Sequence, residues 1–535
     1  MLFRFLSVAA LATSVQGFSV KAPSKVIAVN KANIPEIKAE GLVECPTYDP
    51  SEVSAGILQV GVGNFFRSHF CLYCEDVLNT PDLFEDNKEW GIAGAGLYSP
   101  KKRTMLEPQD WIQTLVERDG TSAKAKLLCS MVDYLPQNTE DESKKHEALM
   151  DKLLDPSTKI VSLTITEGGY FLYDGRFNLA DPAIMKDLDN PDSPQTIFGM
   201  MIKALKIRRE KDIAPFTIMS CDNIPHNGDV VKSIMTGLAE QQCSLDEQLA
   251  CTNFADYIEN EVAFPNSMVD RITPAATDVS IAWLKDTFGV EDVQPVFGEP
   301  FRQWVLEDKF CNGRPAWDKL PEDAGIIFTD DVGCYELMKI RILNGGHASL
   351  AYIAALLDVE YVDGAMNHEL IGPFLDIIEK TEIIPTVPPV PGVVLEEYWD
   401  IIKERFSNPT IEDTIGRNTY DGASRQPKFI VPVAADALKK GTKIDGLAMV
   451  SAMWCRYCQG KTESGKPVPS RDPIWSRLTE TAEEAKTNPN AWLAMKDVYG
   501  EVGENPEFQA AFAKALNIIN EEGVEAALKS YIAEN

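Results

Sequence analysis

The sequence predicts an α/β protein with an N-terminal, Rossmann-like, doubly wound domain and a mostly α-helical C-terminal domain. Between about residues 55 and 330, short apolar segments alternate with longer amphipathic ones, which is typical of buried parallel strands connected by helices. Beyond about residue 330, apolar residues recur mainly at helical spacing. A glycine-containing loop also stands where the first strand would pass into a helix, which favours a dinucleotide-binding domain.

The individual elements follow from these patterns in chain order. Strands of the first domain are predicted at 56–60, 90–97, 159–168 and 214–223, and helices at 65–79, 144–154 and 196–211. Helices of the second domain are predicted at 335–344, 347–357, 371–382, 395–406, 447–460 and 508–520. The proline-rich segment 383–393 breaks the helical pattern and predicts an extended connector. We therefore expect domains at 46–325 and 326–535.

The N-terminal residues have the composition of a targeting segment. Residues 1–17 contain one basic residue, Arg4, followed by an apolar run and small residues, which predicts a signal-peptide-like leader; a buried strand is the alternative. The lysine-rich extension at 18–45 resembles the second part of the two-part leaders that carry proteins into secondary plastids. We expect entry into the secretory pathway or a plastid, with a cytoplasmic location as the alternative.

Composition excludes several classes of partner. A net charge of -30 argues against nucleic acid, because phosphate backbones are bound by clustered lysine and arginine. After the leader, no apolar run is long enough to span a membrane. The CxxC pairs at 71–74 and 455–458 lie in apolar, helix-like segments without nearby histidines, so buried thiols are favoured over a zinc site. We expect a monomer, with an oligomer left open.

The glycine loop reads "GVGNFFRSH" and follows the first predicted strand. In a dinucleotide fold, the glycine at position 61 would make the tight turn, and Gly63 would let a pyrophosphate approach the helix N-terminus. Phe66 occupies the place of the third expected glycine, so an ordinary strand-to-helix turn is the alternative. The guanidinium of Arg67 could pair with a phosphate. Gly61, Gly63, Phe65, Phe66 and Arg67 are therefore the predicted cofactor contacts.

The choice between NAD and NADP depends on the residues after the second strand. An acid there usually holds the ribose 2′-hydroxyl of NAD. This segment reads "GLYSPKKR", with basic residues at 101–103 and no acid. The cluster could accept the 2′-phosphate of NADP, or it could be a solvated run of charge. We expect NAD, with NADP as the alternative, and Lys101 as a further cofactor contact.

Residues 336–347, "ELMKIRILNGGH", place polar groups in an otherwise apolar helix. At about 100° per residue, Glu336, His347 and Asn344 would lie about 60°, 80° and 140° around the helix from Lys339. All four would share one sector, which would face a cleft. The glycines at 345–346 weaken a helix, so they suggest a break there or a close approach by backbone or ligand, and we expect them to give a substrate or nicotinamide room.

Several interpretations of this stretch compete. A solvent-facing stripe on an amphipathic helix is the structural alternative. Tyr335 and Lys339 match the YxxxK pair of short-chain dehydrogenases, but the chain length and glycine loop differ from that class. A zinc-dependent dehydrogenase would need a ligand set that the five histidines do not offer. The remaining interpretation makes Lys339 a metal-free base, because desolvation in a cleft lowers a lysine pKa, with Asn344 stabilising an oxyanion.

The pattern of Lys339, Asn344 and His347 resembles the signature of the polyol-specific long-chain dehydrogenases, the mannitol dehydrogenase family. Further segments resemble the blocks of that family in the family's order: "GVGNFFRSH", "VSLTITEGGY", "FTIMSCDNIPHNG", "FPNSMVDRITP", "EPFRQWVLEDKF", "NGRPAW", "VPGVVLEEY" and "RFSNPTIEDT". The resemblance runs from about residue 50 to the C-terminus. It implies a metal-independent oxidoreductase that transfers a hydride between a nicotinamide cofactor and a polyol/ketose pair.

The resemblance also implies roles for individual residues. Lys339 would be the general acid/base, and Asn344 and Asn223 would contact the oxyanion. Glu336 and Glu167 would pass protons between the lysine and solvent. The residues implied to hold substrate hydroxyls are His347, Asp270 and Arg417.

The resemblance leaves the substrate open within the family. The expected reaction converts D-mannitol and NAD⁺ into D-fructose, NADH and a proton. Fructuronate or tagaturonate reductase, arabinitol dehydrogenase and mannitol-1-phosphate dehydrogenase are alternatives within the family. A noncatalytic polyol or nucleotide binder is disfavoured, because binding alone does not need the lysine base.

Overall fold

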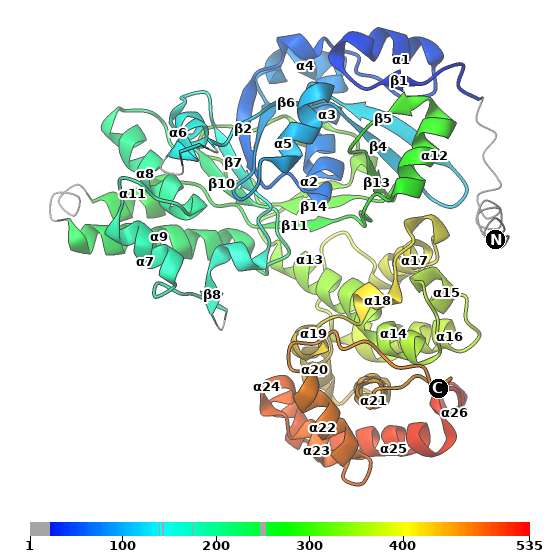
Figure 1. Cartoon of the computed structure of the whole chain (residues 1–535). Helices are drawn as coiled ribbons and strands as arrows, with labels where there is room; N and C mark the ends of the chain where they lie inside the picture. Colours follow the sequence, from blue (N-terminus) through cyan, green and yellow to red (C-terminus); the bar gives the residue numbers. More distant parts are fainter. Residues whose placement is uncertain (1–21, 139, 142–143, 174, 247–252) are drawn as a thin grey trace, which may run out of the picture. The chain divides into compact units, whose positions relative to one another are not determined.

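The computed structural model describes residues 22–138, 140–141, 144–173, 175–246 and 253–535 (Figure 1). The predicted leader at 1–17 and the start of the extension lie outside these residues. The chain divides into two compact units, one ending at Val332 and the other covering Gly333–Asn535. The first contains a parallel sheet with flanking helices and the second is helical, which confirms the predicted fold class.

A five-stranded parallel sheet forms the centre of the first unit, in the order β10-β7-β2-β3-β6. The strands are β2 (Ala55–Val60), β3 (Gly91–Ala95), β6 (Met131–Tyr134), β7 (Ile160–Leu163) and β10 (Thr217–Ser220). Each of the four predicted strands is present, and β6 was not predicted. From β2 the chain adds β3 and β6 on one side of β2, and it then crosses over to add β7 and β10 on the other side. The strand order therefore reverses beside β2. In open α/β sheets, ligands bind beyond the carboxyl ends of strands at such a point.

Helices cover both faces of this sheet. They are α2 (Asn64–Ser68), α3 (Phe70–Asn79), α6 (Glu147–Leu154), α8 (Ile197–Glu210) and α9 (Asn227–Leu245). Successive strand residues point to opposite faces, so Ile57 belongs to the core that contains Phe70 and Leu58 to the core that contains Met201. The helix predicted at 65–79 is interrupted at His69, whose backbone is not helical.

Two smaller sheets extend the first unit and were not predicted. One contains β13 (Val296–Gly298), β4 (Gln113–Arg118) and β5 (Ala123–Leu128). The other contains β11 (Ser267–Asp270), β14 (Gln303–Leu306) and β15 (Ile326–Phe328). Each includes an antiparallel pair, which a pattern of alternating strands and helices does not predict. Helix α12 (Asp278–Phe288) lies between β11 and β13 in the chain.

The second unit is built around helix α14 (Gly345–Leu356), which is buried at every residue except Ala355. A helix buried on all sides lacks a polar face, so its apolar residues surround it. The main helices that accompany it are α13 (Gly333–Met338), α16 (Ile371–Ile378), α17 (Leu395–Phe406), α18 (Ile415–Asn418), α19 (Gly422–Phe429), α20 (Val431–Lys440), α21 (Asp445–Cys458), α25 (Pro506–Glu522) and α26 (Val524–Glu534). The predicted extended connector at 383–393 is wrong in its first part, because Ile384–Thr386 form a 3₁₀ turn.

The structure also bears on the cysteine pairs, on possible metal ligands and on membrane-spanning helices. Cys71 and Cys74 are buried on α3, and Cys455 and Cys458 are buried on α21. Burial raises the pKa of the Cys71 thiol to about 12, so it stays protonated. Within the described ranges, no three His, Cys, Asp or Glu residues are grouped as metal ligands would be. No helix in the described part of the chain is long and apolar enough to cross a membrane.

Candidate functional site

The glycine loop forms a tight turn at the carboxyl end of β2. Gly61 has φ of +89°, and a Cβ built there would lie 2.0 Å from the carbonyl oxygen of Thr164. The Thr164 hydroxyl donates to the Gly61 carbonyl at 2.6 Å. Only glycine fits such a position without displacing the neighbouring strand end. Gly63, at the start of α2, has open space around its Cβ position. The loop thus leaves room beside its backbone, as a bound pyrophosphate requires.

The side chains that follow the loop are more enclosed than predicted. Phe66 is fully buried, and the ring of Phe65 stacks on His69 with centroids 4.8 Å apart. Arg67 is 1% exposed and donates to the backbone carbonyl of Gln294 at 2.5 Å and to the Asn64 side chain at 2.8 Å. Protein groups therefore take the place of the predicted phosphate partner of Arg67. Contacts from Phe66 to a dinucleotide would come from its backbone.

The basic cluster after β3 is divided between different partners. Lys102 donates to the Gln294 side chain at 2.7 Å, and its pKa is lowered to about 8, mainly by burial and also by the charge of Arg67. Arg103 donates to the Tyr134 carbonyl at 2.9 Å. Lys101 is exposed at the start of helix α5 (Lys101–Leu106). Of the three cations, Lys101 is the most accessible to a ligand in solution.

Glu167 and Asn223 follow neighbouring parallel strands, β7 and β10, and both are exposed. Asp222 connects the two segments. Its carboxylate accepts from the backbone N–H of Ile165 at 2.8 Å and from the hydroxyl of Tyr170 at 2.6 Å, and also from the Thr166 N–H at 3.1 Å. Burial raises the pKa of Asp222, and these three donors oppose the rise. No role was predicted for Asp222, although it lies beside Asn223 in the family-like segment "FTIMSCDNIPHNG".

Asp270 is the last residue of β11 and is 3% exposed. It pairs in register with Gln303 of β14. At its other end, β11 is tied to the parallel sheet, because the Ser267 hydroxyl donates to the Ser220 carbonyl at 2.6 Å. This places Asp270 on a well-supported strand of the first unit.

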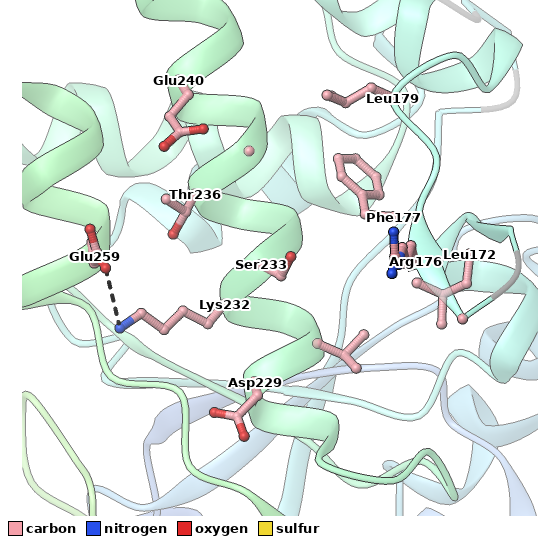
Figure 2. Close-up of a pocket in the computed structure, with 13 residues that line it drawn as sticks. Leu172, Arg176, Phe177, Leu179, Asp229, Lys232, Ser233, Thr236, Glu240 and Glu259 are labelled. Carbon is pink, nitrogen blue, oxygen red and sulfur yellow. Dashed lines mark ion pairs between the residues drawn. The ribbon is translucent and has the colours of Figure 1, made fainter.

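A surface cavity of about 720 Å³ lies beside the hairpin that follows Glu167 (Figure 2). It is bounded by α9 and by strands β8 (Leu172–Tyr173) and β9 (Arg176–Phe177). Lys232 and Glu259 form an ion pair of 4.0 Å on one wall. The predicted site residues do not line this cavity, so it is separate from the candidate site.

The predicted helix at 336–347 exists, but its central turn is a π-helix over Lys339–Asn344. Lys339 and Glu336 are each 6% exposed. A π-helix has hydrogen bonds from residue i+5 to residue i, so Asn344 lies about one turn above Lys339. The separation of about 140° expected from regular α-helical geometry is therefore wrong. The wider turn brings the lysine and the asparagine onto the same side of the helix, and π-bulges are frequent at functional sites.

The expectation for the two glycines is also wrong in part. Gly345 begins α14 with ordinary helical φ and ψ, so the helix does not break. A Cβ at position 346 would lie 3.0 Å from a carboxyl oxygen of Glu379 and 3.3 Å from the Phe406 ring. Protein groups, not a ligand, occupy the space beside Gly346. The absence of a side chain there allows Glu379 and Phe406 to pack against the helix.

His347 and Arg417 are brought together by Asp413. The Arg417 guanidinium donates to both carboxylate oxygens of Asp413, at 2.8 and 2.6 Å. Nδ1 of His347 lies 4.0 Å from the same carboxylate. The imidazole also packs against Phe406 with ring centroids 4.1 Å apart. Two residues that were implied to hold substrate hydroxyls are thus neighbours in the second unit.

The imidazole of His347 is electrically neutral in this environment. Its pKa is lowered to about 3, mainly by burial and also by the positive charges of Arg417, Arg425 and Arg405, while Asp413 opposes the shift. The Asp413 carboxylate is partly buried, but its pKa is lowered by the hydrogen bond from Arg417. The neutral imidazole offers one acceptor nitrogen, and the neighbouring Arg417 guanidinium offers several N–H donors. Together they suit the hydroxyls of a polyol.

Comparisons with known proteins agree with these features. Residues 55–319 match the mannitol dehydrogenase Rossmann domain, and residues 331–520 match the mannitol dehydrogenase C-terminal domain. The fold and these matches define an oxidoreductase with a dinucleotide-type domain and a helical domain. The chain belongs to the mannitol dehydrogenase family.

Individual relatives cover nearly the whole chain. Mannitol 2-dehydrogenase of Cereibacter sphaeroides is 44% identical over 491 residues, which cover 91% of this chain and 98% of the relative. The solved ternary complex of Pseudomonas fluorescens mannitol 2-dehydrogenase with NAD and D-mannitol has a TM-score of 0.81 and 36% identity, over 95% of this chain and 100% of the other. A solved D-sorbitol dehydrogenase also has a TM-score of 0.81, with 31% identity over 94% of this chain and 100% of its own.

Proposed function

We propose that this chain is a mannitol 2-dehydrogenase that interconverts D-mannitol and D-fructose with NAD(H). One observation carries the proposal: Lys339, Asn344 and His347 stand together on a buried helix in a chain that is 44% identical to a mannitol 2-dehydrogenase over 491 residues. The relative solved with NAD and D-mannitol supports the same substrate pair.

The glycine loop fits a dinucleotide cofactor. Gly61 provides the tight turn, and the open space at Gly63 would accommodate a pyrophosphate against the backbone at the start of α2. NAD, when bound, accepts the hydride from the carbon that bears the reacting hydroxyl. Exposed Lys101 stands where a 2′-phosphate would be recognised, so NADP is the alternative cofactor.

The chain's own residues handle the proton. Lys339 takes the proton of the secondary hydroxyl during oxidation and returns it to the oxygen during reduction. Lys339 is 6% exposed, and burial of a lysine in general favours the neutral amine, which is the form that can accept a proton. Asn344 donates to the substrate oxygen, and Glu336 passes the proton to solvent. His347 and Arg417 bind the other hydroxyls. The family resemblance supports roles in the same reaction for Asn223, Glu167 and Asp270.

A substrate panel tests the proposal. D-fructose, fructuronate, tagaturonate and fructose 6-phosphate are each supplied with NADH and with NADPH, and oxidation of the cofactor is followed by absorbance. Fructose with NADH is expected to give the highest kcat/KM. A lack of fructose reduction with both cofactors would remove the proposal, and preference for a sugar acid or a phosphate would select another family activity.

Analysis of the reaction product separates a second candidate. Reduction of fructose at its carbonyl carbon gives either mannitol or sorbitol, depending on the face that receives the hydride. The likeness to D-sorbitol dehydrogenase, with a TM-score equal to that of the mannitol enzyme, favours testing this possibility. We expect mannitol by chromatography, and sorbitol as the main product would reassign the enzyme.

The N-terminal residues support a proposal about location. We propose that residues 1–17 direct the chain into the secretory pathway or, as the first part of a two-part leader, toward a plastid. The apolar run after Arg4 supports this. Residues 27–43 belong to the folded first unit, since Ile27 pairs with Val290 and Ile37 is buried, so a transit segment would have to end before them. Fluorescent fusions with and without residues 1–21 test the proposal. A uniform cytosolic signal from the full-length chain would refute targeting.

A further inference from the structure

We propose that Asp413 is a positioning residue that orients His347 and Arg417 for binding a polyol. The inference rests on the proposed function and assigns a part of the substrate site to a residue outside the family signature. Asp413 has contacts to both side chains, and its own side chain is 8% exposed. It would not touch the substrate.

The backbone fixes Asp413 in place. Its carbonyl accepts from the Val362 N–H at 2.9 Å, and the Ile415 N–H donates to the Glu360 carbonyl at 2.9 Å. Between these bonds, Thr414 forms an antiparallel bridge with Tyr361. The segments 360–362 and 413–415, which are distant in sequence, are therefore paired. This pairing fixes the backbone position from which the Asp413 side chain extends.

Helix α18 then brings Arg417 onto Asp413. The Thr414 hydroxyl accepts from the Arg417 N–H at 3.2 Å and caps the helix, which sets residue 417 one turn after residue 413. The guanidinium uses Nε and one Nη nitrogen on the carboxylate, while the side chain remains 61% exposed. Bidentate pairing fixes the plane of the guanidinium. Its other N–H groups are left for a ligand.

The same carboxylate sets the tautomer of His347. A neutral imidazole has one N–H, and a negative charge 4.0 Å from Nδ1 favours that hydrogen on Nδ1. Nε2 then accepts a hydrogen bond. The ring cannot tilt freely, because Phe406 packs against it. A pair of hydroxyls can donate to His347 and accept from Arg417, which is a recognition element for a polyol or its ketose.

Steady-state kinetics of Asp413→Asn test the inference. The amide keeps the size of the side chain but loses the charge that holds both partners. We expect KM for fructose and mannitol to rise at least tenfold, with a change in kcat of less than about threefold and unchanged NADH affinity, and we expect Asp413→Glu to recover part of the loss. An unchanged KM in Asp413→Asn would overturn the proposal.

A control variant and a second variant complete the test. Asp497 forms a bidentate pair with Arg477 in the same unit, with both contacts at 2.6 Å, so Asp497→Asn also removes a carboxylate–guanidinium pair, and it should leave KM unchanged. Arg417→Lys removes the bidentate geometry while Asp413 stays. It should also raise KM, and a normal KM there would overturn the proposal even if Asp413→Asn did not fold. Wild-type enzyme inactive on every ketose would instead refute the proposed function.

Discussion

The ends of two parallel strands meet in a backbone contact between Gly61 and Thr164. A Cβ at position 61 would lie 2.0 Å from the Thr164 carbonyl oxygen, and Gly61 has φ of +89°. Both facts exclude any other residue without movement of the loop. The turn that would face a dinucleotide is therefore held by contact between β2 and β7.

Alanine at the two loop glycines should separate stability from cofactor binding. Gly61→Ala introduces strain and a clash, so we expect a lower melting temperature and at least a tenfold loss of NADH affinity. Gly63→Ala has open space for its methyl group, so the free enzyme should keep its melting temperature. That methyl would still occupy space needed by the pyrophosphate, and NADH affinity should fall. Fluorescence titration with NADH measures both, and unchanged affinity in Gly63→Ala would contradict the placement of the cofactor.

The central sheet was predictable because each of its strands is a short apolar run that is buried on both faces. Ile160 and Val161 illustrate this, since both are fully buried although their side chains point to opposite sides. The small sheets were missed because their pairings are antiparallel or link distant segments. For example, Val296 pairs with Leu115. Such pairings depend on the folded arrangement and leave little local signal.

The local geometry around the predicted site residues could not be predicted from the sequence. Lys339 and His347 stand out in the sequence as polar groups in an apolar helix. The π-turn between them does not, because it depends on packing against neighbouring helices. Asp413 lies in the family-like segment "RFSNPTIEDT", but no role was predicted for it, because its contact with His347 joins residues that are far apart in the chain. Gly346 was assigned to ligand space, but its neighbour is Glu379.

Removal of the Lys339 amine should abolish turnover and spare cofactor binding. Without the base, proton transfer would rely on water, so Lys339→Ala should lose kcat by orders of magnitude, while NADH affinity stays nearly unchanged. Lys380 is a matched control, because it lies in a second π-turn, Glu379–Ile383, and makes an exposed ion pair of 2.7 Å with Asp376. Lys380→Ala should retain activity. Normal turnover in Lys339→Ala would contradict the assignment of Lys339 as the base.

Asp222 should be needed for the segment that carries Glu167. Asp222→Ala leaves the Ile165 and Thr166 N–H groups without their acceptor, which should destabilise the protein by roughly 2–4 kcal/mol and lower kcat. Asp119 is a control, since its exposed carboxylate also accepts two backbone N–H groups, from Thr121 and Ser122. Asp119→Ala should leave kcat unchanged. Thermal unfolding and initial rates measure both effects, and equal kcat values for the two variants would contradict the role of Asp222.

Buried His69 should make stability depend on pH. Its Nε2 donates to the Gln303 carbonyl at 2.8 Å, and burial lowers its pKa from the ordinary 6.5 to about 3. Between pH 6.5 and about 3, the unfolded chain therefore binds more protons at this residue than the folded chain. The contribution of His69 to the free energy of unfolding is complete above pH 6.5 and declines as the pH falls through this window, by about 1.4 kcal/mol per unit.

A comparison of variants isolates this contribution from other titrating groups. In urea unfolding, the free energy of the wild type should fall relative to His69→Gln by about 2 kcal/mol between pH 7 and pH 5, because about 1.5 units of that interval lie below pH 6.5. The difference is measured at several pH values between 5 and 7. A constant difference between His69→Gln and the wild type would mean that His69 is accessible to protons in the folded chain.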